Sequence, residues 1–468
     1  MSSAIHPEAS EDSLSERLAA LIQSISYESL TAAEIQRTKL LILDTLGVAL
    51  AAVPLDSTTA MSAVVKELGG RGDATVIGTG DRVPAAYAAL ADGALIHSID
   101  YDDTHFPSQV HVCSSVVSAA LVAAEVTGQG GRALIEGVVC GIEAAIRVGM
   151  AAPGRFNDEG FHATGVCGAF GATAAIAKIF GLSTGELAHA LGLVGSQASG
   201  LLVFLSDAAS WVKRVHPGWA AHSGYIAVKL AQHGFTGPRP VFEGRFGLYD
   251  SHVGEFDPTI LTDDLGILQV MRVGVKAFPT GQLHIPFMSL TRTLMQEHGL
   301  TADEIENIEC RITPRAIETV CAPEDVKRRP VDGYSAKFSL QYGVAAMAVR
   351  GQATLAEYTD EAVKDPAILA MADRVTYVPD ETADFPRNVP AWIVLTTKDG
   401  RIFEGREPIH LGHPENFLSD DLLTEKFYDC TVPIIGQERA MALREQILRL
   451  DDDAPVSDLV ASTIVGTR

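Results

Sequence analysis

Helices rich in Gly and Ala are the feature that most constrains how this chain folds. They include GAFGATAAIAKIFG (168–181) and GLVGSQASGLL (192–202). Gly is costly inside a helix, and small side chains let helix axes approach closely, so these segments predict a tight bundle. Capping boxes at Thr31–Glu34 and Ser183–Glu186 mark the starts of apolar periodic runs. We therefore predict that residues 1–271 are almost entirely helical.

The pattern changes after this helical part. Apolar residues between Ile305 and Ile312 have the spacing of a strand, just after a capping box at Thr301–Glu304. Segments 392–397 and 401–405 flank Lys398-Asp399-Gly400, which indicates a hairpin. Helical periodicity resumes near Ser419. The predicted fold class is mostly α: a large all-helical domain formed by both chain ends, with a smaller inserted α+β lid domain. The predicted ranges are 1–271, 272–408 and 409–468.

Composition excludes several classes of function. The chain has 468 residues, 47% of them hydrophobic, and a formal net charge of −23. No basic stripe is present, so nucleic-acid binding is excluded, and an acidic substrate would need a local cluster of cations. Six widely spaced cysteines without C-x-x-C indicate reduced thiols. The N-terminus MSSAIHPEASEDSLSER lacks an apolar core, and no clean apolar run reaches membrane length, so we predict a cytoplasmic protein with no membrane partner.

One polar segment stands between two apolar ones. Residues 97–111 read HSIDYDDTHFPSQVH. Buried polar groups of this density need partners, and a catalytic pocket would supply them. If the segment is helical, Asp100 and Thr104 share a face, with Asp102 and Asp103 pointing elsewhere. Alternatives are a helix cap, a solvated turn or a Mg²⁺ site; no phosphate loop or second carboxylate cluster supports the last.

Two histidines are candidates for proton transfer. His111 and His162 each lie at the edge of a segment rich in small residues. The alternative role for each is a structural, hydrogen-bonded histidine. Together with His105 they could suggest zinc, but no H-E-x-x-H spacing is present, and we predict no metal and no cofactor.

Cationic residues gather in two places. Lys213, Arg214 and His216 lie between two tryptophans, which suggests a carboxylate clamp, unless they form a solvated basic turn. Lys276 and His284 lie where the fold changes, and ligand sites favour domain junctions. Tyr334 and Lys337 could line the same junction. A plain linker is the alternative.

The motifs together resemble one family. IDYDDTH, GFHATGVCGAFGATAAIAKIFGLS, SQASGL, WVKRVHPGWAAHSG, FTGPRPVFEGRFG, KAFPTGQLH and FSLQYGVA are similar in order and spacing to the MmgE/PrpD family. The resemblance implies the two-domain fold predicted above, a homodimer and no cofactor. It also implies site residues. The catalytic residues would be His111, His162, Asp100 and Lys213. The substrate-binding residues would be Thr104, Lys276, His284 and Arg214.

The resemblance further implies chemistry at the carbon α to a carboxylate of a small di- or tricarboxylic acid. Lysines would neutralise the developing charge, a histidine would move the proton and Asp100 would orient that histidine. Two departures from the decarboxylase and dehydratase patterns, Gly281 and His111-Val-Cys, favour an epimerase of a diacid such as iminodisuccinate. The alternatives are 2-methylcitrate dehydratase, cis-aconitate decarboxylase, or an inactive carboxylate-binding or scaffold protein.

Overall fold

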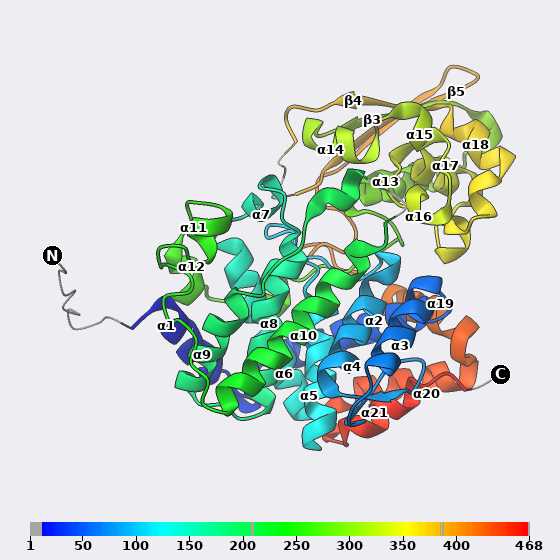
Figure 1. The fold of residues 1–468 in the computed structure, drawn as a ribbon. Helices are drawn as coiled ribbons and strands as arrows, with labels where there is room; N and C mark the ends of the chain where they lie inside the picture. The colour runs from blue at the N-terminus through cyan, green and yellow to red at the C-terminus, as the bar shows by residue number, and fades with distance from the viewer. Residues whose placement is uncertain (1–11, 207–209, 384, 386–387, 467–468) are drawn as a thin grey trace.

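The computed structural model describes residues 12–206, 210–383, 385 and 388–466 (Figure 1). Residues 1–11, which make up most of the N-terminal segment analysed for a signal peptide, lie outside the described part. Two separate hydrophobic cores organise the chain. The first draws on residues from Leu14 to Val275 and again from Leu423 to Val460. The second draws on residues from Phe278 to Leu395.

The first core is enclosed by a helical bundle, and the protein is mostly α as predicted. In Figure 1 the C-terminal helices α20 and α21 lie at the end of the bundle away from the sheet of the second unit, and α19 and α20 pack against α2. The longer bundle helices are α1 (Leu14–Ser24), α2 (Ala32–Ala52), α3 (Asp56–Leu68), α4 (Ala85–Ile96), α5 (Val112–Thr127), α6 (Gly131–Met150), α8 (Ala163–Ile179), α9 (Thr184–Gly195), α10 (Val212–Gln232), α19 (Asp420–Ile435) and α20 (Gln437–Leu448). The shorter ones are α7 (Arg155–Asp158), α11 (Leu248–His252), α12 (Pro258–Thr262) and α21 (Val456–Ser462).

Local signals place the helix starts correctly. Thr31 and Ser183 cap α2 and α9, and in each case a glutamate three residues on completes the capping box. One local feature was missed. Strands β1 (Ala74–Thr75) and β2 (Arg82–Val83) form a small antiparallel pair within the predicted all-helical part, because two-residue strands leave no periodic pattern to detect.

Glycine contacts confirm the predicted close packing and set the position of α10. A Cβ on Gly93 of α4 would lie 2.7 Å from the Cα of Gly218 on α10. Likewise, a Cβ on Gly171 of α8 would lie 2.7 Å from the carbonyl oxygen of Gly141 on α6. No side chain fits at these crossings. The contact of α10 with α4 brings the start of α10 close to the segment that follows α4.

The second core belongs to an α+β domain. Its sheet has the order β4-β3-β5-β6, with β3 and β4 parallel and the other pairs antiparallel. The strands are β3 (Ile305–Ile312), β4 (Val375–Pro379), β5 (Ala391–Thr397) and β6 (Ile402–Glu407). The helices are α13 (Ile285–Glu297), α14 (Pro314–Val320), α15 (Glu324–Arg328), α16 (Gly333–Ala336), α17 (Leu340–Arg350) and α18 (Pro366–Ala372). The predicted strand at 305–312 and the predicted hairpin are both confirmed.

Within the described residues, no single helix is both long and apolar enough to cross a membrane. Helices α2 and α3 meet the length and composition test only as a pair, and they are bent by 93° at their junction.

Candidate active site

The polar segment after α4 is a turn and a loop, not a continuation of the helix. A short 3₁₀ turn covers His97–Ile99, and Asp100 then adopts a left-handed backbone conformation with φ 54° and ψ 35°. Aspartate is among the few residues that tolerate this region. The expectation that Asp100 and Thr104 share a helical face was therefore wrong. Both residues nevertheless line one pocket, and Thr104 is held there by an antiparallel bridge to Gly274.

The Asp100 carboxylate lies between two ammonium groups. Its Oδ1 is 2.5 Å from Lys213 Nζ and 3.2 Å from Lys276 Nζ, and Lys276 also donates to the Asp100 carbonyl at 2.8 Å. All three side chains are buried. Asp100 was predicted to orient a histidine. In the structure its carboxylate instead pairs with two lysines. Its role follows from charge, since a buried ammonium requires a counter-ion.

Burial and pairing set the charge states of these three groups. Burial opposes ionisation of Asp100, but Lys213 and Lys276 outweigh it and hold the pKa of its carboxyl well below the usual range. Burial also opposes the charge of Lys213, yet the close Asp100 carboxylate raises the pKa of that lysine. The pKa of Lys276 is lowered, because burial there exceeds the attraction of the more distant carboxylate. Lys276 is therefore the cation of the pair that loses its proton more readily.

Two further lysines hold the same turn. Lys337, from the α+β domain, donates to the Ile99 carbonyl at 2.5 Å, and Lys426 of α19 donates to the Tyr101 carbonyl at 2.9 Å. With the Asp100 carbonyl, three consecutive backbone acceptors each receive a buried ammonium group. Burial lowers the pKa of Lys337 to about 7. The turn is thus tied to both domains. Lys426 lies in no motif that pointed to this contact.

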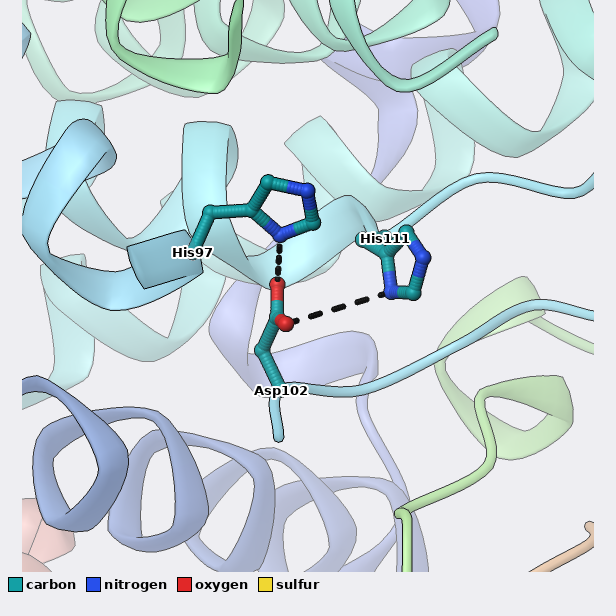
Figure 2. Close-up of side chains that lie close together, drawn as sticks. All are labelled: His97, Asp102 and His111. Atoms are coloured by element: carbon teal, nitrogen blue, oxygen red, sulfur yellow. Dashed lines mark hydrogen bonds and ion pairs between the residues drawn. The ribbon is translucent and has the colours of Figure 1, made fainter. Parts of the chain in front are cut away.

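A second carboxylate, that of Asp102, lies beside the imidazoles of His97 and His111 (Figure 2). Asp102 Oδ2 accepts from His97 Nδ1 at 2.8 Å, and its Oδ1 lies 4.0 Å from His111 Nδ1. His111 Nδ1 is also 2.7 Å from the Asp103 carbonyl oxygen, which can only accept. Nδ1 of His111 therefore carries the hydrogen and Nε2 keeps its lone pair. Burial lowers the pKa of His111 to about 3, so the ring is neutral at neutral pH.

Asp102 and His97 are functional candidates that the residue-by-residue prediction passed over. Burial opposes ionisation of Asp102, yet the imidazoles of His97 and His111 lower the pKa of its carboxyl below the usual value. Asp103, next in sequence, accepts from the backbone N–H groups of Val112 and Cys113 and so caps α5. The density of carboxylates in the segment indicated that it carries functional groups. The spacing of these carboxylates could not tell which one lies beside which imidazole.

A second pair of imidazoles completes the cluster. His162 precedes α8, and its Nδ1 lies 2.9 Å from Nδ1 of His216 on α10. One of these nitrogens must donate and the other accept, so the pair shares a single hydrogen. Burial lowers the pKa of His162 well below its ordinary value and that of His216 to about 4. The ring of His162 also stacks 5.8 Å from that of His97.

A cavity of about 340 Å³ opens between the two domains at this cluster. Six of the eight predicted site residues line it: Asp100, Thr104, His111, His162, Lys213 and Lys276. The opposite wall comes from the α+β domain and includes Gly281, Arg315 and Phe338. This cavity, hereafter the catalytic pocket, is at the domain junction, as expected for a ligand site.

Two of the predicted substrate-binding residues do not line the catalytic pocket. Arg214 donates to Ser57 at 2.7 Å and lies over the ring of Tyr334, 4.3 Å from its centroid. His284 is fully buried and hydrogen-bonded to Thr280, and burial lowers its pKa to about 3. Arg214 was selected as part of the cationic cluster between two tryptophans, and His284 for its position where the fold changes. Closeness in sequence to a pocket lysine does not place a side chain in the pocket, because the folded backbone directs each side chain differently.

The imidazole–carboxylate cluster does not fit a metal ion. His97, Asp102 and His111 offer atoms that all lie within 4.8 Å of one another. However, the Nδ1 atoms of both histidines face acceptor oxygens, and His111 uses its Nδ1 hydrogen on a backbone carbonyl. The ammonium groups of Lys213 and Lys276 line the same pocket and would repel a cation. The donors favour binding of an anion.

Fold and site together define a helical protein with an inserted α+β domain and a pocket at their junction that is lined by ammonium groups and imidazoles. Residues 16–261 match the model of the MmgE/PrpD N-terminal domain, and residues 278–452 match that of the MmgE/PrpD C-terminal domain. The chain belongs to the MmgE/PrpD family.

Relatives of this chain include cis-aconitate decarboxylases, a decarboxylase-like protein and 2-methylcitrate dehydratases. Human cis-aconitate decarboxylase is 28% identical over 94% of this chain and 92% of its own length. A cis-aconitate decarboxylase-like protein of Aspergillus oryzae is 27% identical over 96% of this chain and 97% of its own. The 2-methylcitrate dehydratase of Salmonella typhimurium is 26% identical over 74% of each chain.

Proposed function

We propose that this protein is a cofactor-independent lyase that acts on a small di- or tricarboxylic acid at the carbon α to a carboxylate. The reaction that we favour is decarboxylation of a cis-aconitate-type acid. The observation that carries the proposal is the meeting of Lys213, Lys276 and His111 in one buried pocket. Similarity to the decarboxylases spans nearly the whole chain, whereas the match to the Salmonella dehydratase covers 74% of it.

The ammonium groups have donors left for a substrate. Each ammonium carries three N–H bonds. Lys276 directs its donors to the carbonyl and carboxylate of Asp100, and Lys213 directs one to that carboxylate. Remaining donors can bind a substrate carboxylate, with Asp100 keeping the lysines charged until it arrives. Fixed cations of this kind also stabilise negative charge that develops in the transition state.

His111 is the group that moves the proton. Its Nε2 carries the free lone pair, because Nδ1 is held by the Asp103 carbonyl. A polyanion bound beside it favours the imidazolium, which can then donate. In decarboxylation, a C–C bond breaks to release CO₂ and its electron pair forms a new alkene. The electron pair of the old alkene then takes the proton from His111 at the neighbouring carbon.

Dehydration is the second candidate, since a relative with that activity matches three quarters of the chain. His111 would then remove the α proton while a second acid protonates the departing hydroxyl. The predicted epimerase of an aspartate-like diacid has less support than either, because the relatives named above are decarboxylases and a dehydratase. An inactive scaffold would have no use for the buried charges around Asp100. A homodimeric state remains a separate proposal, which light scattering would test.

The test is incubation with cis-aconitate or with 2-methylcitrate in D₂O, followed by NMR. Decarboxylation gives itaconate with one deuterium at the newly protonated carbon. A new alkene without loss of CO₂ indicates dehydration, and α-deuteration alone indicates epimerisation. Failure of every acid to react would refute the lyase.

We expect His111→Asn to lower kcat by roughly 10² to 10⁴ because it removes the proton carrier. The matched control is His252→Asn, a half-buried histidine bonded to the Leu248 carbonyl and absent from the pocket lining. Equal activity of the two variants would remove His111 from the mechanism.

A further inference from the structure

A second cavity adjoins the catalytic pocket. It has a volume of about 400 Å³ and shares five lining residues with that pocket. These shared residues are Phe204, Leu205, Lys213, Thr319 and Phe338. The catalytic pocket alone, at about 340 Å³, already falls within the range of ~300–1,000 Å³ typical of small-molecule sites. The second cavity therefore offers room beyond what a short polar acid requires.

The chemistry changes across the shared wall. On one side lie the ammonium groups and imidazoles of the catalytic pocket. On the other, the segment around α15 contributes the apolar residues Ala322, Pro323, Val326 and Pro330, and the only carboxylate among the described lining residues is that of the exposed Glu318. The Lys327 ammonium that borders this side is already used, because it donates to two backbone carbonyls at 2.6 and 2.8 Å.

Lys213 marks the boundary between the two sides. Its Nζ holds the Asp100 carboxylate and lies 5.4 Å from the centroid of the Phe338 ring. Beyond it, Leu205 is 58% and Val326 51% exposed, although both line the cavity. Large apolar side chains left open on facing walls gain free energy when an apolar group covers them.

We propose that the second cavity is a subsite for an apolar substituent of the substrate, so that the preferred acid carries an alkyl chain of several carbons. Its carboxylates bind at Lys213 and Lys276, and the chain extends past Phe338 into the second cavity, hereafter the alkyl subsite. The proposal rests on the proposed function for the identity of the catalytic pocket, but the subsite itself is defined by its own walls.

Binding of 2-alkylsuccinates, which cannot undergo the lyase reaction, tests the subsite directly. Calorimetry across methyl to hexyl homologues should show affinity rising about 4-fold per methylene, the value that burial of one CH₂ provides. Turnover of the matching 2-alkyl-substituted cis-aconitates should show the same progression in kcat/KM. n-Hexanol, which lacks carboxylates, should bind far more weakly than hexylsuccinate.

Val326→Trp fills the alkyl subsite and should flatten the dependence on chain length. Val331→Trp is the matched control, because Val331 is 77% exposed and absent from the lining of both cavities. The control should keep the full progression.

The outcomes separate the two proposals. Affinity independent of chain length, or equal slopes for the two variants, would overturn the alkyl subsite. Hexanol binding as tightly as hexylsuccinate would also overturn it, because it would show a general apolar surface. A rising affinity series without any turnover would support the subsite and refute the lyase.

Discussion

Replacing Asp100 by Asn tests the charge arrangement on which the site depends. The amide has the shape of the carboxylate but no charge, so it leaves the ammonium groups of Lys213 and Lys276 buried without their counter-ion. The Lys276 side chain is 1% exposed and that of Lys213 10%. Breaking a buried ion pair by removing one partner costs about 3–5 kcal/mol. We expect a loss of this size at pH 7.

The loss should depend on pH with a definite sign. In the native protein the pKa of Asp100 lies below its unfolded value, so its contribution is present above about pH 4 and lost in more acidic solution. In the variant, both lysines have folded pKa values below the unfolded value of about 10.4. The unfolded chain then binds more protons, and stability rises with pH across that window. The gap between the variant and the native protein should therefore be larger at pH 7 than at pH 9.5.

Thermal unfolding between pH 6.5 and 9.5 measures this effect. The control is Asp158→Asn, since Asp158 lines the same pocket and pairs with Arg315, but both side chains are about half exposed. An exposed pair is worth about 0–1 kcal/mol, so the control should change little at any pH. If Asp100→Asn unfolds like the native protein at pH 7, or its deficit is the same at pH 9.5, the proposed role of Asp100 is wrong.

Three further predictions follow from the same contacts. Asp102→Asn removes the negative charge that lies 4.0 Å from His111 Nδ1. The imidazolium then loses a stabilising charge, so kcat should fall about tenfold or more with little change in KM. A change confined to KM would contradict this prediction. Lys337→Met leaves the Ile99 carbonyl without its donor, so it should lower the free energy of unfolding by about 1–3 kcal/mol and raise KM. The control is Lys178→Met, which removes a donor to the Gln23 carbonyl and should leave KM unchanged. Equal KM values for the two lysine variants would argue against Lys337. Finally, the pKa of His111 is about 3 in the folded protein, so the unfolded chain binds more protons between pH 6.5 and 3. The free energy of unfolding should therefore fall on acidification by up to ~1.4 kcal/mol per pH unit from this group. Unfolding midpoints that stay constant from pH 7 to 5 would refute this prediction.

Local rules explain why so much of the fold was predictable. Helix starts at Thr31 and Ser183 depend on hydrogen bonds between residues three apart, and the hairpin around Asp399 depends on a turn of a few residues. The small residues on α8 and α9 could be recognised as packing positions, because Gly is costly inside a helix unless close packing requires it. Six of the eight predicted site residues line the pocket. They were selected from the polar segment after α4, the cationic cluster, the domain junction and the family resemblance.

The sequence by itself determined the long helices, the strand at 305–312, the hairpin, the tight packing and the segments that carry the chemistry, because each is set by neighbours a few residues apart. Only the tertiary structure decided the pairings. Asp100 and Lys213 are separated by 113 positions, and Ile99 and Lys337 by 238. Which ammonium meets which oxygen depends on how the bundle helices cross and where the α+β domain docks, and no local pattern encodes that geometry. For this reason Asp100 holds lysines, and Asp102, which the residue-by-residue prediction passed over, serves the imidazoles.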